Sequence, residues 1–337
     1  MLLNVVPFSK TNLNPFEEIK STYAEQLKKV DNHIKLKLSS HVDLVGEMAT
    51  HLMKTGGKRL RPLLTICSSE IFNYKGDRHI NLAACVELIH NATLLHDDVI
   101  DNSLSRRGFK TTNAIWGNKS SILAGDYLLS RCFEMMVDDG SDEILKILSS
   151  VSSEIAQGEI LQLQFEKQVD MVEKNYLDII SAKTASLFGA SMRVGGCINN
   201  RSKKEKEALE SFGRNLGICF QITDDILDYS AKEKFFGKKI GNDYLEGKIT
   251  LPIILLFQKS NKIERQMLNK FFSQDVRNQN DFNKTVDLID KYKIIEVCKK
   301  RADYFSNVAA DSLSIFEKNF TVEKLQELSF YIVNRLN

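Results

Sequence analysis

The chain has 337 residues, of which 43% are hydrophobic and 27% charged, a composition that excludes a disordered or collagen-like protein. Its 46 Lys and Arg residues against 44 Asp and Glu residues give a net charge of only +2. No basic surplus is present to neutralise a nucleic-acid backbone, so we expect no nucleic-acid partner. The longest apolar run, residues 251–257, is far shorter than the ~20 residues of a transmembrane helix. The start of the chain has no signal-peptide pattern, and we therefore expect a cytoplasmic protein without a transmembrane segment.

Proline is scarce in this sequence. Of four prolines, only Pro62 and Pro252 lie beyond residue 15, and there are 17 glycines. So few helix breakers, together with the lack of alternating strand patterns, predict an all-α protein. Both internal prolines stand where a helix would begin, because the first helical turn tolerates proline. We expect residues 1–15 to form a flexible lead-in and residues 16–337 to form one domain of roughly ten or more helices.

Apolar residues at helical spacing define the expected elements. In chain order they predict helices over 16–37, 41–55, 62–73, 79–101, 120–138, 141–168, 173–195, 203–229, 251–258 and 262–275, with further helices within 281–335. Helix 79–101 and the second half of helix 203–229 are apolar around most of their circumference, which predicts a central, buried position. The six cysteines have no metal-ligand spacing, and we expect buried free thiols.

Each of these two central helices finishes in a cluster of three aspartates: Asp97, Asp98 and Asp101 in the first, and Asp224, Asp225 and Asp228 in the second. Positions i and i+4 of a helix project within about 40° of each other. The carboxylates therefore crowd at helix C-termini, where the helix dipole disfavours acids. One such cluster could equally be a solvated helix end, but two matching clusters on buried helices favour a bound cation. Magnesium suits this setting, because it uses one or two carboxylates and takes other ligands from phosphates.

Basic residues are grouped around the acid clusters. Lys58, Arg59 and Arg61 precede a helix start, where backbone N–H groups also attract anions. The others follow the clusters or lie in mid-helix: Arg106, Arg107, Lys183 beside Thr184, Lys238, Lys239 and Lys248. Any one of them would ordinarily be a solvated surface charge. Cations that bind oxygens, together with carboxylates that bind metals, predict the handling of a diphosphate.

These residues resemble the motifs of the trans-isoprenyl diphosphate synthases, and most of all those of the long-chain octaprenyl and decaprenyl members. Five motifs occur in the family's order: GGKRLRP at 56–62, DDVID at 97–101, AKTAS at 182–186, DDILD at 224–228 and GNDYLEGKITLP at 241–252. The resemblance covers roughly residues 20–335. It implies the isoprenoid synthase fold, a single helical bundle around a central substrate cavity. Asn242, where many members carry Asp, and Tyr244, where Leu is usual, depart from the pattern.

The resemblance also implies a role for each matching residue. Asp97 and Asp101 bind Mg²⁺ on an allylic diphosphate with Asp98 beside them, and Asp224 holds a further Mg²⁺ supported by Asp225 and Asp228; about three ions are expected. The diphosphate of isopentenyl diphosphate is expected at Lys58, Arg61, His90 and Arg107. The allylic diphosphate is expected at Arg106, Lys183, Thr184, Gln221, Lys238 and Lys248. His90 lies two turns before Asp97 and on the same helix face, which favours a ligand role over a core position.

The implied reaction is a Mg²⁺-dependent prenyl transfer that lengthens an allylic diphosphate such as farnesyl or geranylgeranyl diphosphate. Its product length is expected to depend on side chains one or two turns before Asp97, each turn being about 5.4 Å. Thr93 and Ala92 are small where short-chain enzymes tend to carry an aromatic residue. We therefore expect an all-trans product of about C40–C50, with Phe133 as the tunnel floor, near Met136, and quinone side chains as its use. A short-chain C15–C20 synthase is the alternative.

Other functions fit less well. A terpene cyclase would not need a second acid cluster or GGKRLRP, and a metal-dependent phosphohydrolase, suggested by His90 and His96-Asp97, would leave the second cluster idle. An inactive subunit of a heteromeric synthase would be expected to have lost acids or cations. By resemblance we expect a homodimer. Contact with a membrane surface would help to release an insoluble polyprenyl product.

Overall fold

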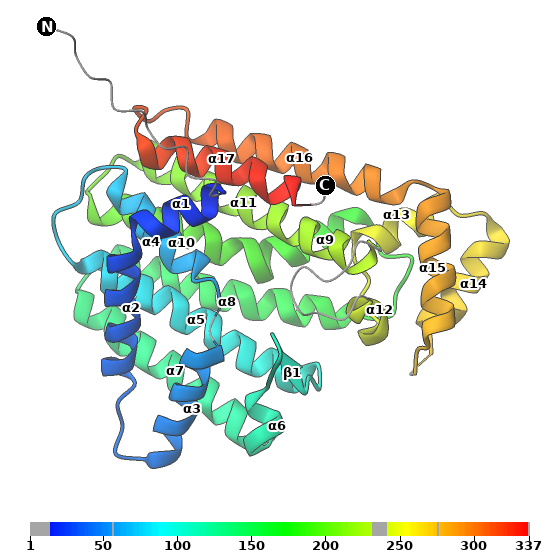
Figure 1. Cartoon of the computed structure of the whole chain (residues 1–337), viewed down its shortest axis with the longest axis horizontal. Helices are drawn as coiled ribbons and strands as arrows, with labels where there is room; N and C mark the ends of the chain where they lie inside the picture. Colours follow the sequence, from blue (N-terminus) through cyan, green and yellow to red (C-terminus); the bar gives the residue numbers. More distant parts are fainter. Residues whose placement is uncertain (1–13, 56, 231–240, 275, 336–337) are drawn as a thin grey trace, which may run out of the picture.

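Helices form along nearly the whole chain in the computed structural model, which describes residues 14–55, 57–230, 241–274 and 276–335 (Figure 1). The helices are α1 (Pro15–Thr22), α2 (Ala24–Lys37), α3 (Asp43–Thr55), α4 (Leu60–Glu70), α5 (Arg78–Ile100), α6 (Thr112–Trp116), α7 (Asn118–Asp139), α8 (Asp142–Gln164), α9 (Glu173–Ile180), α10 (Ser186–Ile198), α11 (Lys203–Tyr229), α12 (Asn242–Glu246), α13 (Leu251–Lys259), α14 (Lys262–Phe272), α15 (Gln279–Lys291), α16 (Ile294–Ser312) and α17 (Phe320–Asn334). A π-helical turn, Ser181–Ala185, joins α9 to α10, and a hairpin of β1 (Ser105–Arg106) and β2 (Phe109–Lys110) follows α5. The predicted all-helical fold is confirmed.

The helices start where the sequence offers start signals. Ser202 accepts a hydrogen bond from the backbone of Glu205, whose side chain bonds back to Ser202, so a capping box opens α11. Pro62 and Pro252 lie in the first turns of α4 and α13, as predicted. Of the predicted lead-in, residues 1–13 lie outside the described part of the chain, and α1 begins at Pro15.

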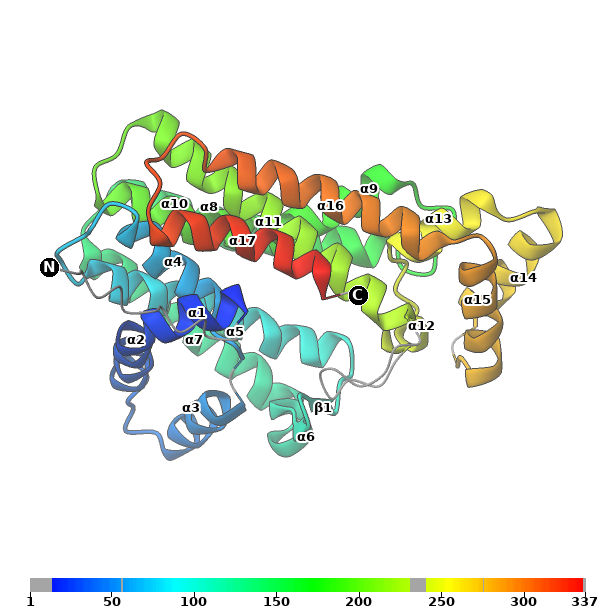
Figure 2. The ribbon, with the colours of Figure 1, turned by 45° about the horizontal axis from the view of Figure 1, so that its top comes forward.

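The two long helices α5 and α11 lie at the centre of the bundle, which explains their apolar circumference. Helix α5 packs against α4 and α7, and α11 packs against α10 and α16. Helices α16 and α17 run along one side of the bundle, whereas α14 and α15 stand across its end (Figure 2). Both acid clusters therefore lie at the C-terminal ends of core helices, where packing against the neighbouring helices fixes the backbone of the aspartates.

The structure differs from the expected elements in several places. The range 16–37 divides into α1 and α2, and 173–195 is interrupted by the π-turn Ser181–Ala185, whereas further helices fill 281–335 as expected. The short helices α6 and α12 were not predicted. The hairpin was not predicted, because each strand has only two residues. Its turn has positive φ at both central residues, Arg107 (53°) and Gly108 (83°), which is the backbone of a two-residue hairpin turn.

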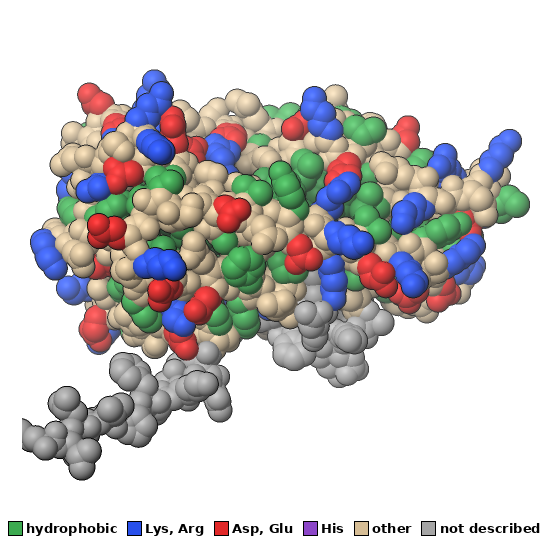
Figure 3. All heavy atoms as spheres, turned by 90° about the horizontal axis from the view of Figure 1, so that it is seen from above, with side chains coloured by type: hydrophobic (Ala, Val, Ile, Leu, Met, Phe, Trp, Pro, Cys, Tyr) green, Lys and Arg blue, Asp and Glu red, His purple; other side chains and the backbone are tan. Residues whose placement is uncertain are grey.

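Surface and core otherwise follow the composition. All six cysteines are buried and free, as predicted. On the face shown in Figure 3, positive and negative side chains of the described residues are interspersed among hydrophobic ones. No helix within the described ranges is both long and apolar enough to cross a membrane.

Candidate active site

Both acid clusters face one cavity of about 370 Å³ between the ends of α5 and α11. Helices α8, α9 and α12 and the π-turn complete its walls. Among the predicted site residues, the cavity is lined by Asp97, Asp101, Arg106, Lys183, Thr184, Gln221, Asp224, Asp225 and Lys248. Residues 127 apart in the sequence thus share one space, because the two central helices end side by side.

Each carboxylate of the first cluster has a cationic partner. Asp97 lies 3.8 Å from Lys183, Asp98 lies 2.8 Å from Arg106, and Asp101 lies 2.8 Å from Lys248. Burial raises the pKa of Asp97 to about 6, although Lys183 counteracts this. Burial also raises the pKa of Asp98, and Arg106 opposes the shift. The cluster is therefore neutralised from three different elements of the chain.

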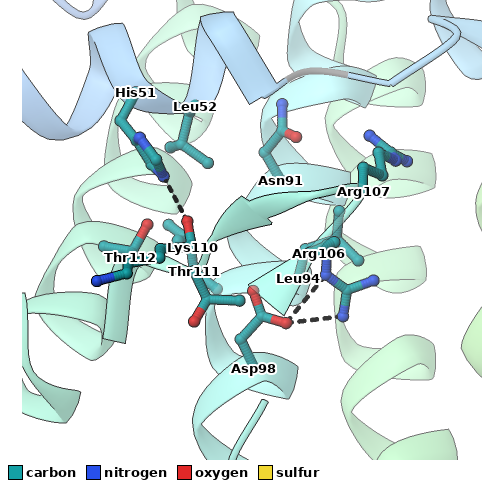
Figure 4. A pocket seen from close by; sticks show the side chains of 11 residues that line it. His51, Leu52, Asn91, Leu94, Asp98, Arg106, Arg107, Lys110, Thr111 and Thr112 are labelled. Atoms are coloured by element: carbon teal, nitrogen blue, oxygen red, sulfur yellow. Dashed lines mark hydrogen bonds and ion pairs between the residues drawn. The ribbon is translucent and has the colours of Figure 1, made fainter. Parts of the chain in front are cut away.

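The hairpin after α5 separates its two arginines. Arg106 donates through two nitrogens to the same Asp98 oxygen, at 2.9 and 2.8 Å, whereas Arg107 leaves the hairpin in a different direction (Figure 4). His51 of α3 donates to the carbonyl oxygen of Lys110 at 2.9 Å and so ties the hairpin to α3, beside a small cavity of about 40 Å³. Both arginines line the small cavity, and Arg106 alone of the two also lines the large one.

The π-turn presents Lys183 to the cavity. Lys183 forms an ion pair with Glu159 and donates to Gln162 at 3.3 Å, both from α8. Gly158 of α8 allows this close approach, because a Cβ atom there would lie 2.7 Å from the backbone nitrogen of Lys183. A π-turn widens the helix locally, and such turns are frequent at functional sites.

The three aspartates of the second cluster have different environments. Asp225 is buried and accepts hydrogen bonds from Tyr176 at 2.7 Å and Gln221 at 2.8 Å, and Thr184 donates to the same Gln221 at 3.0 Å. Burial raises the pKa of Asp225 to about 7, against the lowering effect of those two donors. Asp224 lines the cavity.

Asp228 supports the loop that follows. Its carboxylate accepts backbone N–H groups of Asn242 at 3.3 Å and Asp243 at 2.8 Å, the first two residues of α12. This contact stabilises the positive end of a short helix. The same loop carries Lys248 to Asp101, while Tyr244 packs edge-on against Phe272, with ring centroids 5.2 Å apart. Tyr244 thus has a packing role. The predicted ligand Lys238 lies outside the described residues.

A second group of cations gathers beside α5. Arg61 donates to Nε2 of His90 at 3.2 Å and stacks 4.5 Å above the ring of Phe188. The guanidinium of Arg107 lies against Gly57, where a Cβ atom would be 2.6 Å from it. Lys58 belongs to the same loop. The buried Nε of Arg61 has no hydrogen-bond partner among the described residues, which fits a site that receives an anion.

His90 is a neutral member of this cationic group. Because the guanidinium of Arg61 can only donate, the Nε2 atom of His90 must accept the hydrogen bond between the two side chains. Burial, reinforced by Arg61 and Arg107, holds the pKa of His90 well below its ordinary value. In this structure His90 therefore orients Arg61 without adding a fourth positive charge.

The residues predicted to control product length lie in different surroundings. Ala92 is fully buried one turn before His96, and Thr93 is half-buried with its hydroxyl bonded to the His90 carbonyl. Phe133 is 44% exposed on α7, whereas Met136 on the same helix is buried. Phe133 does not line the cavity described above, so within one chain the structure does not bring it to the site. Its role as floor stays a prediction.

The cavity carboxylates suit a hard divalent cation. Within the described ranges, no three His, Cys, Asp or Glu side chains are grouped closely enough to hold an ion by themselves. Mg²⁺ commonly uses one or two protein carboxylates and completes its shell with water and phosphate oxygens. Asp97 and Asp101 on one wall and Asp224 on the other supply such oxygens. The donor chemistry therefore fits Mg²⁺ held jointly by the protein and a phosphate ligand.

Several lining residues were missed by the sequence analysis. Glu159 and Gln162 of α8, Tyr176 of α9, and Asp243 and Glu246 of α12 either line the cavity or contact its charged groups. They lie on three separate helices outside the recognised aspartate clusters. Only the acidic pair at 243 and 246, close to Lys248 in the sequence, offered a local signal.

Comparison with known proteins agrees with this geometry. The family described as "Polyprenyl synthetase" matches residues 42–289. The octaprenyl diphosphate synthase of Escherichia coli is 34% identical, over 95% of this chain and 98% of that protein. The crystal structure of a decaprenyl diphosphate synthase from Rhodobacter capsulatus has a TM-score of 0.91 and 37% identity, covering 96% of this chain and 100% of that one. A polyprenyl synthase from Caulobacter crescentus, complexed with calcium and isoprenyl diphosphate, also gives 0.91, with 36% identity and coverage of 98% and 99%.

Proposed function

The chain belongs to the polyprenyl synthetase family and is a prenyltransferase, and from that premise we propose that it condenses isopentenyl diphosphate with an allylic diphosphate to make a long-chain polyprenyl diphosphate. The observation that carries the proposal is the shared cavity of the two acid clusters, with a second group of cations, around Arg61 and Arg107, outside its lining. Two separate anion sites are what a reaction between two diphosphates requires. A hydrolase or a cyclase would need only one.

Magnesium is the proposed metal. Asp97 and Asp101 would hold ions on one side of the allylic diphosphate and Asp224 on the other, in line with the family's dependence on Mg²⁺ and with the calcium in the Caulobacter crescentus structure. When bound, the metal supplies positive charge that stabilises a departing diphosphate. The family resemblance gives about three ions, a number that stays a prediction.

Substrate binding then changes the partners of the cations. Arg106, Lys183 and Lys248 each pair with an aspartate of the first cluster. A bound metal offers those carboxylates a stronger partner, and the diphosphate oxygens offer the cations one. We infer that the three cations turn toward the diphosphate, with Thr184 and Gln221 as additional hydrogen-bonding groups.

The reaction breaks the bond between the allylic carbon and the diphosphate oxygen. Arg106, Lys183 and Lys248 stabilise the negative charge that develops on the leaving oxygen. Lys58, Arg61 and Arg107, with Arg61 oriented by His90, bind the diphosphate of isopentenyl diphosphate, whose double bond attacks the allylic cation. Loss of one proton leaves a chain longer by one isoprene unit.

A product of about C40–C50 is proposed, which is roughly eight to ten isoprene units at one helical turn each. The support is the small size of Ala92 and Thr93 and the printed names of the octaprenyl and decaprenyl relatives. The use of such a product in quinone side chains follows from its length alone. The cytoplasmic location expected from the sequence stays a prediction.

We also propose a homodimer. Four apolar side chains of α7 are exposed in the single chain, by 43% to 66%: Ile122, Leu123, Phe133 and Val137. Exposed apolar groups along one helix favour contact with another protein surface, and a second copy is the partner that the family resemblance implies. Sedimentation of the purified protein tests this: a monomer mass at micromolar concentration would contradict it.

The decisive test is elongation by the purified protein. The protein is incubated with isopentenyl diphosphate, farnesyl diphosphate and Mg²⁺, and the dephosphorylated products are separated by length. Products ending near C40–C50 are expected. Products ending at C20 would retain prenyl transfer but refute the length inference. No elongation, with or without a partner protein, would favour an inactive subunit of a heteromeric synthase.

A further inference from the structure

The loop before α4 carries three cations, but they do not point the same way. Arg61 reaches His90 of α5, and the ammonium of Lys58 lies 5.8 Å from the centre of the Phe16 ring of α1, whereas Arg59 turns toward carboxylates of α2 and α5. Its Nε donates to Asp31 at 3.0 Å and one terminal nitrogen donates to Glu87 at 2.6 Å. The side chain of Arg59 is only 10% exposed and that of Glu87 only 3%. Arg59 is thus buried among carboxylates rather than directed at substrate.

The backbone at Arg59 is also unusual. Its φ of 57° and ψ of 34° lie in the left-handed region, which is unfavourable for a residue with a Cβ atom. Arg59 is the residue at which the loop turns into α4. A conformation of this kind persists only where surrounding contacts fix it, and the two carboxylates supply those contacts.

Glu87 links this loop to α5. It lies three residues before His90, one helical turn away, and His90 accepts a hydrogen bond from Arg61. Burial raises the pKa of Glu87, and Arg59 opposes that shift. The pair Arg59–Glu87 therefore joins the loop that carries Lys58 and Arg61 to the helix that carries His90.

The cations Lys58, Arg61 and Arg107 repel one another unless an anion lies between them. Burial lowers the pKa of Arg61 to about 10, and Arg107 adds to that effect. Burial and nearby Arg335 likewise lower the pKa of Lys58. Flexible cations under such repulsion would spread apart unless their backbone were anchored.

We propose that Arg59 and Glu87 form a positioning pair that fixes the loop carrying Lys58 and Arg61 against the helix that carries His90, in the arrangement needed to bind the diphosphate of isopentenyl diphosphate. Neither residue touches that substrate. The inference rests on the proposed function for the identity of the ligand. The Arg59–Glu87 contact is thus expected to strengthen the binding of isopentenyl diphosphate, although it is buried and lies outside both diphosphate sites.

The first test replaces Glu87→Gln, which keeps the shape of the side chain and removes its charge. We expect Kd and KM for isopentenyl diphosphate to rise about ten-fold, equal to 1.4 kcal/mol. KM for farnesyl diphosphate should stay within about two-fold, because its site lies on other elements. Calorimetry measures the binding of isopentenyl diphosphate without turnover, so an inactive wild-type protein that binds it would refute the proposed reaction and still test the pair.

Arg59 loses one of its two carboxylate partners in Glu87→Gln, and an incompletely paired buried guanidinium destabilises a fold. The double variant Arg59→Met/Glu87→Met avoids this, because both buried charges disappear together and Asp31 remains 37% exposed to water. It should melt near the wild-type temperature and show the same rise in Kd for isopentenyl diphosphate. The matched control is Asp139→Asn, which weakens the two-pronged pair with Arg78 at the far end of α5.

The control separates positioning from general stability. Asp139→Asn should lower the melting temperature while leaving both KM values within about two-fold. The proposal is overturned if the folded Glu87 variants bind isopentenyl diphosphate like the wild type. It is equally overturned if the KM values for both substrates rise together, or if the wild-type chain does not bind isopentenyl diphosphate.

Discussion

Gly158 of α8 is a position where packing alone is expected to affect a charged group of the cavity, because it lies directly against the π-turn that carries Lys183. In Gly158→Ala the new Cβ atom would lie 2.7 Å from the backbone nitrogen of Lys183 and 2.9 Å from the Cβ atom of Ala182, where ordinary contact begins at 3.4 Å. These atoms belong to the backbone and to a short side chain, so neither can rotate away. The π-turn must move by several tenths of an ångström and must carry Lys183 with it.

Two opposing contributions set the change in the free energy of unfolding of Gly158→Ala. Crowding of this kind costs about 1–3 kcal/mol, and alanine regains up to about 1 kcal/mol of helix propensity in α8. We therefore expect a net loss of stability of about 0–3 kcal/mol, together with a fall in kcat of about ten-fold or more, because small displacements of positioning groups are costly in catalysis. Steady-state kinetics with both substrates saturating, combined with a thermal melt, measure the two effects.

A matched control uses the same substitution in open space. No atom lies within 4 Å of the Cβ position at Gly46 in α3, so Gly46→Ala should keep wild-type kcat and melt at the same temperature or slightly higher. Wild-type kcat in Gly158→Ala would refute the inference that close packing at this glycine positions Lys183. Equal losses in both variants would refute it as well.

Three further outcomes are expected. Asp97→Ala and Asp224→Ala should each abolish turnover while circular dichroism stays helical; near-full activity in either would exclude it as an essential metal ligand. Ala92→Phe should shorten the product, since it fills a fully buried position before the first cluster; an unchanged distribution of chain lengths would remove the reason for placing the tunnel there. Removal of Mg²⁺ with a chelator should weaken the binding of farnesyl diphosphate in calorimetry, and equal affinity with and without the metal would contradict joint binding.

The fold and the acid clusters were predictable because their signals are local. A buried helix appears as an apolar circumference, and three aspartates at its end are conspicuous because they conflict with both burial and the helix dipole. The same reasoning correctly placed the prolines at helix starts. Residues such as Asp97 and Asp224, each on the apolar helix that positions it, could therefore be brought to one site without coordinates.

The remaining contacts depend on how distant segments pack. Nothing near Tyr176 in the sequence indicates that its hydroxyl holds Asp225, and the π-turn at Lys183 depends on a glycine 25 positions earlier. Arg59 shows the limit most clearly. The family resemblance gives roles to its neighbours Lys58 and Arg61 and none to Arg59, and only the fold reveals that Arg59 is buried against carboxylates of α2 and α5.

The ion pairs between the aspartates and the cations of the cavity couple the binding of metal to the binding of diphosphate. A metal alone must compete with Lys183, Arg106 and Lys248 for the aspartates, and a diphosphate alone must compete with the aspartates for those cations. When both bind, every separated charge acquires a new partner of opposite sign, so each ligand lowers the cost of binding the other. Such coupling is reciprocal by thermodynamic necessity. This coupling favours the protein with metal and diphosphate bound together over the protein with either one bound alone.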